Sequence, residues 1–443
     1  MVEAGRAREN LDALMAGLAC CFARVEPRWQ ARKYVTALLG DLPRKNCWTI
    51  AERAGDATPD RMQRLLERAC WDHEAAMSVV RDFVAGRLGS AGAVVVIDES
   101  GQEKKGERTA GVKRQYVGCA GRIANAINVV YCSYAVPAGH ALVAARLYIP
   151  REWAGDRQRR HAAGVPDEVE FKTKPQLAVE MLTGLTGAGG CPPWCAGDEV
   201  YGRDTKLRAF LEGQGIGYVL GVPCSFRITV PSGRKIGVAH AAALVPARAW
   251  ITASCGKGSK GDRDYAWAWL ATASPRHTML ARRNLHDPSA DLAFFYCHVP
   301  ECLPACFTTL VQVAGRRWPV EEDFQVGKGC FGLDHSQVRT YTAICRHLVL
   351  SMAALAVCAV TAASARERTT ALPPPASPHD QPPAGPGLIP LTVAEVRRLF
   401  CLLTRVFQDA RHHLRWSWWR RRHQARARWY HQRARLQRQA AGP

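Results

Sequence analysis

Residues 316–328, Arg-Arg-Trp-Pro-Val-Glu-Glu-Asp-Phe-Gln-Val-Gly-Lys, predict a helix whose charged face decides how the rest of the chain is interpreted. Pro319 suits the first turn of a helix, where its missing N–H costs no hydrogen bond. Arg317, Glu321 and Lys328 lie at i, i+4 and i+11 and therefore share one face. A carboxylate between two cations could hold a metal ion and anionic phosphates together. The segment alone fits equally well a solvated helix with an ordinary i,i+4 ion pair.

The composition of the chain indicates a large protein with a polyanionic partner. Its 443 residues leave room for two or three domains. Its net charge of +21 favours nucleic acid or an anionic membrane as the partner. The one long apolar run, residues 348–365, is only at the lower limit of a membrane span. We therefore expect a buried core helix there and no membrane contact.

The seventeen cysteines come without an N-terminal secretory signal, which favours a reducing compartment, the cytoplasm. The pairs Cys191/Cys195 and Cys302/Cys306 lack histidines at zinc-finger spacing. We therefore expect the cysteines to serve packing rather than a zinc site.

Residues 1–90 predict a helical domain. Trp48–Arg53 and Asp60–Trp71 form two short helices around a glycine turn, with Thr58 as N-cap and Pro59 at the first helical position. Two short helices around a turn resemble a helix-turn-helix that could bind DNA. Any small helical bundle contains such pairs, so an ordinary helical hairpin remains the alternative.

Two short apolar runs each lead into an aspartate. Ala93–Ile97 is β-branched and ends in Asp98, and Trp194–Gly197 runs into Asp198. The ends of buried strands are where α/β sheets place functional groups, although an aspartate also commonly starts a turn. Strands and helices are expected between and after these runs, at Arg114–Val117, Ala126–Tyr134, Ala141–Ile149, Pro175–Leu185 (helix), Thr205–Leu211 (helix) and Gly217–Val222. The pattern predicts a mixed sheet with helices on its faces.

Glu321 follows Asp198 by 123 positions in the sequence. A single crossover needs only about 30 residues, so something is inserted. The strands expected there are Trp250–Ala253, Asp264–Leu270, Met279–Arg282 and Leu292–Val299. We predict a β-rich insertion before the glutamate-bearing helix.

The order of the three acidic motifs resembles a known family. Asp98 within Ile-Asp-Glu-Ser-Gly, Asp198 within Gly-Asp-Glu-Val-Tyr-Gly and Glu321 within Arg-Trp-Pro-Val-Glu-Glu-Asp-Phe are similar to the Asp-Asp-Glu transposases of bacterial insertion sequences. Within them the chain looks like the insertion sequence 701 family. Three further stretches share this likeness, namely residues 111–116, 332–335 and 416–424. The resemblance runs from about residue 25 to the C-terminal tail.

The resemblance implies metal-dependent DNA strand cleavage and strand transfer. It implies that Asp98, Asp198 and Glu321 are the catalytic residues and bind Mg²⁺ or Mn²⁺, as two ions. Two such ions activate the attacking oxygen and stabilise the leaving oxygen, and both prefer hard oxygen ligands. Three carboxylates without metal would repel by roughly 4 kcal/mol per pair at 4 Å and an effective dielectric near 20. A metal site therefore explains them better than a structural core does.

The family also has a Tyr-Arg-Glu-Lys motif, whose last three positions fit Arg317, Glu321 and Lys328. Its tyrosine position holds Ala314 here, which removes one expected phosphate contact. Arg317 would bind phosphate bidentately and Lys328 as a point charge. Lys104 and Lys105, which follow the first motif, are further candidates for DNA binding.

The C-terminal tail is strongly basic. Residues 411–443 contain ten arginines and no acidic residue, with tryptophans between them. Arginine with aromatic residues favours contact with a nucleic-acid backbone, and the DNA-binding candidates here are Arg420, Arg421 and Arg422. A solvated basic tail without a defined role is the alternative.

We therefore predict a ribonuclease-H-like mixed α/β fold with flanking helices. The predicted domains are a helical domain at 1–90, the catalytic domain at 91–222 and 306–368, a β-rich insertion at 223–305, a Pro-rich linker at 369–390 and a basic helical segment at 391–443. The expected partner is double-stranded DNA, both terminal inverted repeats and target, bound by a dimer or higher multimer at the nucleoid. A catalytically decayed transposase that only binds DNA, or a nuclease or resolvase on the same fold, are the alternatives.

Overall fold

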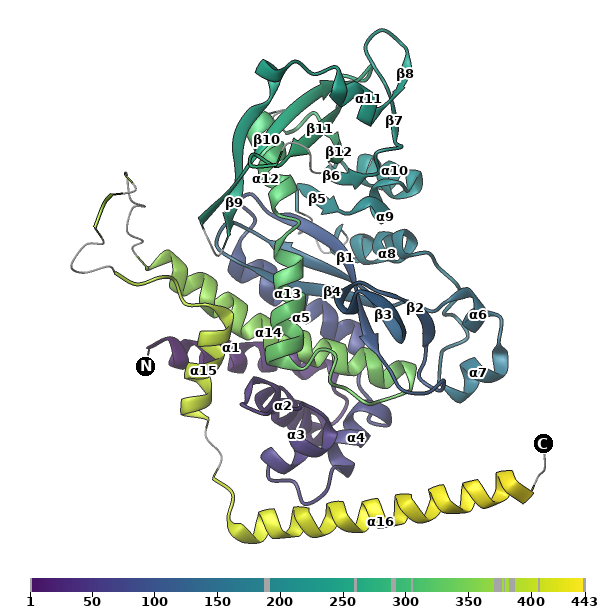
Figure 1. Cartoon of the computed structure of the whole chain (residues 1–443). Helices are drawn as coiled ribbons and strands as arrows, with labels where there is room; N and C mark the ends of the chain where they lie inside the picture. The colour runs from purple at the N-terminus through teal and green to yellow at the C-terminus, as the bar shows by residue number, and fades with distance from the viewer. Residues whose placement is uncertain are drawn as a thin grey trace.

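A large mixed sheet runs through the molecule, as Figure 1 shows for the computed structural model. The structure describes residues 2–186, 192–258, 261–287, 292–303, 306–369, 377, 379–381, 387–404 and 407–440. In these residues ten strands form one sheet in the order β2-β3-β1-β5-β6-β12-β11-β10-β9, with β4 also paired to β3. The strands are β1 Val94–Glu103, β2 Lys113–Val117, β3 Arg122–Ala135, β4 His140–Leu147, β5 Trp194–Gly197, β6 Gly217–Val222, β9 Ile251–Gly258, β10 Gly261–Ala271, β11 His277–Arg283 and β12 Ala293–His298. A mixed α/β fold is confirmed.

Strand β1 lies at the centre of the first half of the sheet. It pairs antiparallel with β3 over its whole length, from Val94 to Glu103, and parallel with β5 only from Val94 to Ile97. The sequence-based prediction that the strand ends at Asp98 is wrong, because the ladder to β3 keeps the following polar residues extended. Asp98 is instead the first residue beyond the pairing with β5.

The second half of the sheet comes from residues after β6. Strand β12 pairs antiparallel with β6, and β11, β10 and β9 follow outward. The strands predicted between residues 250 and 299 are thus present, and they extend the central sheet. A small hairpin of β7 Arg227–Thr229 and β8 Lys235–Gly237 and the helix α11 Val238–Ala243 pack on this half around a second, smaller core. The division of the chain into domains stays a prediction.

The N-terminal helices form a bundle in which all but α3 contact one apolar helix, α14. They are α1 Val2–Gly17, α2 Val25–Leu39, α3 Cys47–Arg53, α4 Asp60–Glu67 and α5 His73–Leu88, and α14 spans Tyr341–Glu367. The length and composition of α14 would suffice to cross a membrane, but 94% of its most apolar window is buried inside the protein. The prediction of a buried core helix at residues 348–365 is confirmed. The helix predicted to reach Trp71 ends at Glu67, because Trp71 instead bridges to Phe22.

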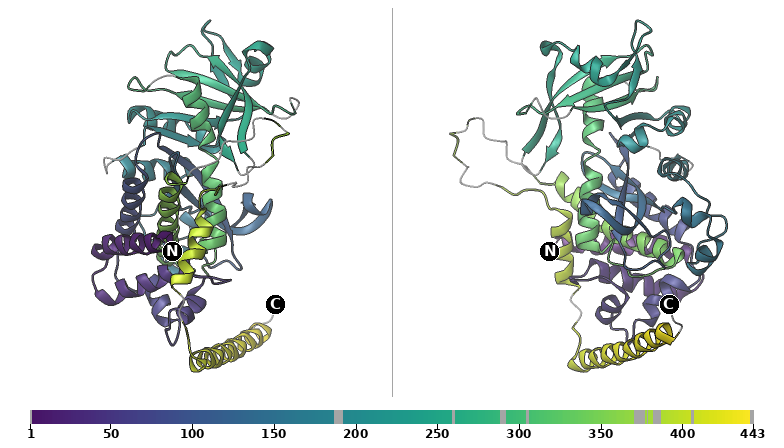
Figure 2. Two further views of the ribbon diagram at one scale, coloured as in Figure 1. Left: turned by 90° about the vertical axis from the view of Figure 1, so that its left-hand side faces the viewer. Right: turned by 45° about the vertical axis from the view of Figure 1, so that its right-hand side comes forward.

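Most of the remaining helices flank the sheet, whereas α15 packs on α1 and α14, and α16 lies apart from the sheet beside α3, as the two views of Figure 2 show. The remaining helices are α6 Arg151–Ala154, α7 Arg157–Ala162, α8 Lys174–Thr186, α9 Glu199–Gly202, α10 Thr205–Gly213, α12 Phe307–Gly315, α13 Pro319–Phe331, α15 Val393–Leu403 and α16 Ala410–Ala440. The prolines of the predicted linker, at 373–375 and 382–383, lie outside the described residues. Helix α13 is the predicted glutamate-bearing helix, and it begins at Pro319 as expected.

Candidate active site

The register of two neighbouring strands brings the two predicted aspartates together. Strands β1 and β5 are parallel, and Ile97 is the partner of Gly197. Asp98 and Asp198 directly follow these two partner residues, so their backbones lie at adjacent positions, about 5 Å apart. Strand β5 ends there, and Asp198 becomes the N-cap of α9 with its carboxylate accepting a 2.9 Å hydrogen bond from the Val200 amide.

The glycine that closes the second motif sets how closely α9 approaches the sheet. A Cβ on Gly202 would lie 1.9 Å from the carbonyl oxygen of Gly221 in β6, which leaves no room for a side chain. The short helix after Asp198 can therefore lie directly against β6. This close approach fixes where the backbone of Asp198 turns away from β5.

The two aspartates lie where negative charge is unfavourable. The side chain of Asp98 is only 13% exposed. Burial, together with the nearby Asp198 and Glu99 carboxylates, raises the pKa of Asp98 to about 7, although the Arg317 guanidinium opposes this. Burial and then Glu99 also raise the pKa of Asp198, against the Val200 amide and Arg317. The pair therefore needs additional positive charge to be ionised together at neutral pH.

Arg317 links the first aspartate to the predicted glutamate. One guanidinium nitrogen, Nη2, lies 3.8 Å from Asp98 Oδ2, and the other, Nη1, donates to Glu321 Oε1 at 3.2 Å. The Glu321 side chain is 42% exposed. The i,i+4 pair read from the sequence is thus present, and it faces Asp98.

Asp98 and Asp198 fit a hard divalent cation by the chemistry of their donors. Carboxylate oxygens are the ligands that Mg²⁺ and Mn²⁺ prefer, and a bound cation would offset the burial that raises the pKa of both aspartates. Glu321 contacts the same Arg317 guanidinium that lies near Asp98, so that positive group, rather than a metal ion, links the two carboxylates. Accordingly, among the described residues no three His, Cys, Asp or Glu side chains are grouped closely enough to hold a metal ion as they stand.

Glu99 belongs to this cluster and was missed by the sequence interpretation. Its carboxylate accepts hydrogen bonds from Tyr201 Oη at 2.8 Å and from Lys174 Nζ at 2.5 Å. The acidic residue follows Asp98 directly, and Tyr201 belongs to the second motif. The two motifs therefore also contact each other through Glu99, which holds α9 and α8 next to β1.

A second set of residues that the sequence interpretation missed attaches helix α13 to the β3–β4 hairpin. Asp323 is 2% exposed and accepts hydrogen bonds from Ser133 Oγ at 2.5 Å and from His140 at 2.9 Å. The other ring nitrogen of His140 lies 3.3 Å from Glu322 Oε2. Glu322 and Asp323 thus point to the β3–β4 hairpin, whereas Glu321 points to Arg317.

The lysines predicted to bind DNA have different surroundings. Lys328 Nζ donates to the carbonyl oxygen of Gly101 in β1 at 3.2 Å. Lys104 Nζ donates to the carbonyl oxygen of Ser336 at 2.7 Å, and burial lowers its pKa to about 8. Lys105 is exposed. The ammonium group of Lys104 therefore has an internal role that the sequence did not indicate.

The tail arginines also divide into two kinds. Arg420 Nη1 donates to Glu52 Oε2 at 2.6 Å and so joins α16 to α3. Arg421 and Arg422 are exposed. All three remain predictions as DNA ligands, but only the latter two present their charge to solvent.

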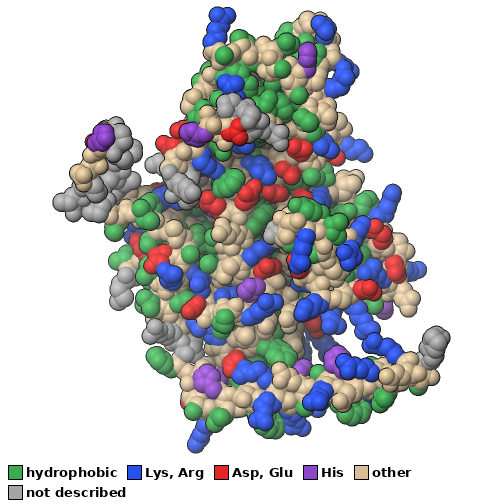
Figure 3. Space-filling view, viewed as in Figure 1, with side chains coloured by type: hydrophobic (Ala, Val, Ile, Leu, Met, Phe, Trp, Pro, Cys, Tyr) green, Lys and Arg blue, Asp and Glu red, His purple; other side chains and the backbone are tan. Residues whose placement is uncertain are grey.

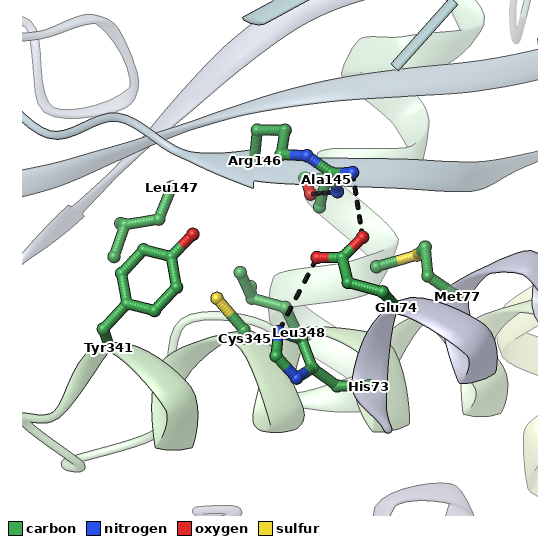
Figure 4. Close-up of a pocket in the computed structure, with 9 residues that line it drawn as sticks. All are labelled: His73, Glu74, Met77, Ala145, Arg146, Leu147, Tyr341, Cys345 and Leu348. Atoms are coloured by element: carbon green, nitrogen blue, oxygen red, sulfur yellow. Dashed lines mark hydrogen bonds and ion pairs between the residues drawn. The ribbon is translucent and has the colours of Figure 1, made fainter. Parts of the chain in front are cut away.

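Figure 4 shows a small cavity elsewhere, between α5, β4 and α14. A 2.8 Å ion pair between Arg146 and Glu74 lies at its edge, beside Tyr341 and Cys345. None of the predicted site residues lines this cavity, so it is separate from the carboxylate cluster.

Comparison with known proteins shows similarity to a protein family and to a curated relative. The model of a family described as DDE superfamily endonuclease matches residues 17–262, a range that contains Asp98 and Asp198 and ends before Glu321. A probable transposase for insertion sequence element IS701 from Microchaete diplosiphon is 28% identical over 203 residues, which cover 44% of this chain and 49% of that protein. The chain thus spans about half the length of the curated relative that it matches.

Proposed function

We propose, since this chain belongs to the family of DDE superfamily endonucleases, that it is a DNA transposase that cleaves and joins strands at the ends of an insertion sequence. The observation that carries the proposal is the register of β1 against β5, which sets Asp98 beside Asp198. The relative's description as a probable transposase favours this activity over that of a general nuclease or resolvase. The proposed substrates are duplex DNA ends and a target duplex, bound by a dimer or higher multimer in the cytoplasm.

The finer description of the fold as ribonuclease-H-like is part of the proposal. Its support is the strand order β4-β3-β1-β5-β6, in which neighbouring strands of the first three are antiparallel and β5 and β6 run parallel to β1. Helix α13 contacts β1, β3 and β4 of this core. The proposed catalytic side chains thus come from β1, from α13 and from the tight junction between β5 and α9, which are well-supported positions.

Enzymes of this family generally use divalent metal ions. For this chain we propose two ions, either Mg²⁺ or Mn²⁺, with Asp98, Asp198 and Glu321 as their ligands. Such ions supply an activated attacking oxygen and a stabilised leaving oxygen. Carboxylates bind such ions in their ionised form, and a bound cation would oppose the burial that raises the pKa of Asp98.

Arg317 is suited to exchange partners when DNA is present. A guanidinium binds a phosphate through two parallel hydrogen bonds, as it binds a carboxylate. Transfer of Arg317 from Glu321 to a DNA phosphate would leave the half-exposed Glu321 carboxylate available beside Asp98. Lys328, held near β1 by the Gly101 carbonyl, would add a second positive charge on the same helix.

The test is a cleavage assay with DNA that carries the candidate element ends. Purified protein, Mg²⁺ and end-labelled duplex should give breaks that map to one position at each end. Asp98→Asn and Asp198→Asn should abolish these breaks and leave DNA binding nearly intact, because both side chains are proposed to bind metal. Asp204→Asn is the matched control, since Asp204 also caps a helix, α10, but lies outside the cluster. Breaks at near wild-type rate in either cluster variant would overturn the assignment.

A further inference from the structure

Helix α16 is attached to the body of the protein by its first part. Trp416 is fully buried and its indole N–H donates to the carbonyl oxygen of Asp56 at 2.9 Å. His412 lies 2.9 Å from the carbonyl oxygen of Glu52, whose side chain binds Arg420. The Trp419 ring packs edge-on against Trp48 of α3, with ring centroids 4.9 Å apart. The orientation of the helix is therefore set by contacts with α3 and with the turn that follows it.

Beyond this anchor the helix extends away from the rest of the chain. From residue 424 to residue 440 every side chain is exposed except those of Ala427 and Ala434, which are partly covered. These seventeen residues span about 25 Å at 1.5 Å per residue. Both views of Figure 2 show the helix as a separate rod below the helical half of the molecule. Among the described residues, no acidic side chain forms an ion pair with an arginine beyond Arg420.

The exposed arginines form two rows along this rod. At 100° per residue, the members of each row lie within about 40° of one another. The first row is Arg422, Arg426 and Arg433, and the second is Arg421, Arg428 and Arg435. An exposed apolar row, Trp418, Trp429 and Leu436, lies between them. In Figure 3, Lys and Arg side chains accordingly project from both edges of the helix.

Two rows of like charge on one helix need an anionic partner. Arginines three or four residues apart repel each other and destabilise an isolated helix. A second copy of the same helix would set arginine against arginine and increase this repulsion. A DNA duplex instead offers two rows of phosphates on either side of a groove, and the major groove admits an α-helix. Continuous basic helices bind DNA in this way, and the apolar row would then face base edges such as the thymine methyl groups.

We propose that residues 421–440 of α16 lie in the major groove of duplex DNA, with α3 holding the helix at a defined angle to the protein. The inference rests on the proposed function for the presence of DNA, and it adds a binding surface that is distinct from the carboxylate cluster. The two arginine rows contact the two phosphate strands that flank the groove. The tail would thus bind DNA in a defined orientation, and not only by non-specific electrostatic attraction.

The experiment compares two triple variants of the full-length protein. The first replaces Arg422, Arg426 and Arg433 by glutamine. The control replaces three exposed arginines outside the tail, Arg28, Arg234 and Arg248, and so removes the same charge. Binding to a fluorescent 30-base-pair duplex is measured by anisotropy across a salt titration in EDTA. Circular dichroism verifies that both variants are folded.

We expect the row variant to bind at least tenfold more weakly at 0.1 M salt. The slope of log K against log salt should become shallower by about 2.7, from three phosphate contacts at about 0.9 each. The control variant should show a much smaller loss of affinity and a much smaller change in the salt slope. Equal slopes in the two variants would overturn the inference.

Two further measurements separate other partners. Binding to phosphatidylglycerol vesicles that the row variant loses, with unchanged DNA binding, would assign the surface to a membrane and overturn the proposal. A changed oligomeric state with an unchanged salt slope would assign it to a second copy. Cleavage of end DNA is measured separately. If the wild type cleaves no end DNA but the row variant still loses DNA binding, the proposed transposase function is refuted and the proposed DNA-binding surface of α16 is retained.

Discussion

Replacing His140 by glutamine should lower the free energy of unfolding by about 3 kcal/mol at pH 6. Burial works against a charged imidazole, but Asp323 and Glu322 raise the pKa of His140 to about 9. The rise from 6.5 is about 2.5 units, which at about 1.36 kcal/mol per unit gives about 3 kcal/mol. The His140 side chain is 21% exposed and that of Asp323 is 2% exposed, so solvent screens the pair only weakly. Breaking a buried pair by removing one partner costs about 3–5 kcal/mol, which agrees.

The pH dependence of this loss distinguishes charge from packing. Because the folded state raises the pKa, the stabilisation is fully present below pH 6.5 and is lost as the pH rises through about 9. The wild type should therefore lose about 3 kcal/mol of stability from this group between about pH 6 and pH 10. The His140→Gln variant should lose none from it. The two proteins should become nearly equal in stability at pH 10.

The assay is urea unfolding in EDTA at pH 6 and pH 10 for both proteins. The exposed His161→Gln serves as control. Asp323→Asn, alone and combined with His140→Gln, completes a double-mutant cycle whose coupling free energy should be about 3 kcal/mol at pH 6. A His140→Gln variant that is equally destabilised at both pH values would show that packing, and not the ion pair, fixes α13. That result would refute the reasoning.

The remaining predictions concern the two glutamates and one glycine. Glu321→Gln should stop cleavage of pre-bound end DNA at every concentration in a Mg²⁺ titration. Glu322→Gln should retain most activity, because the Glu322 carboxylate faces away from the cluster. An inactive Glu322→Gln variant beside an active Glu321→Gln variant would mean that the two glutamates are assigned to the wrong faces of the helix. Gly202→Ala should give mostly insoluble protein, because its Cβ would lie 1.9 Å from a carbonyl oxygen of β6, whereas Gly213→Ala meets open space and should stay soluble. Soluble yield and cleavage rate measure this, and a soluble, active Gly202→Ala would contradict the packing.

Sequence patterns predicted the elements whose signals are local. The apolar run before Asp98, bounded by glycines, is a buried strand, and the alanine-rich run at 348–365 is a buried helix. The continuation of β1 to Glu103 was not predictable, since Ser100 and Gln102 are polar and yet buried. They stay in the strand because β3 pairs with them, and that partner is nearly thirty residues away in the sequence.

The same distinction holds for the candidate site. Motif spacing indicated Asp98, Asp198, Arg317 and Glu321, and the strand register and ion pairs place these residues next to one another in two linked pairs. The contribution of His140 was not predictable, because it depends on contacts with residues about 180 positions away. Nor could composition tell an anchoring arginine in the tail from an exposed one, since that depends on the distant Glu52.

The contacts of α13 explain why we propose Glu321, rather than its acidic neighbours Glu322 and Asp323, as the catalytic residue of this helix. Asp323 is buried against Ser133 and His140, and Glu322 is held by the same histidine, so both are committed to the β3–β4 hairpin. Near the other end of the helix, the Lys328 ammonium group is tied to β1 through a backbone carbonyl. The helix is thereby fixed to the strand that carries Asp98 and to the hairpin beside it. Glu321 is held in position by this scaffold, and its only described partner is an arginine that can exchange a carboxylate for a phosphate.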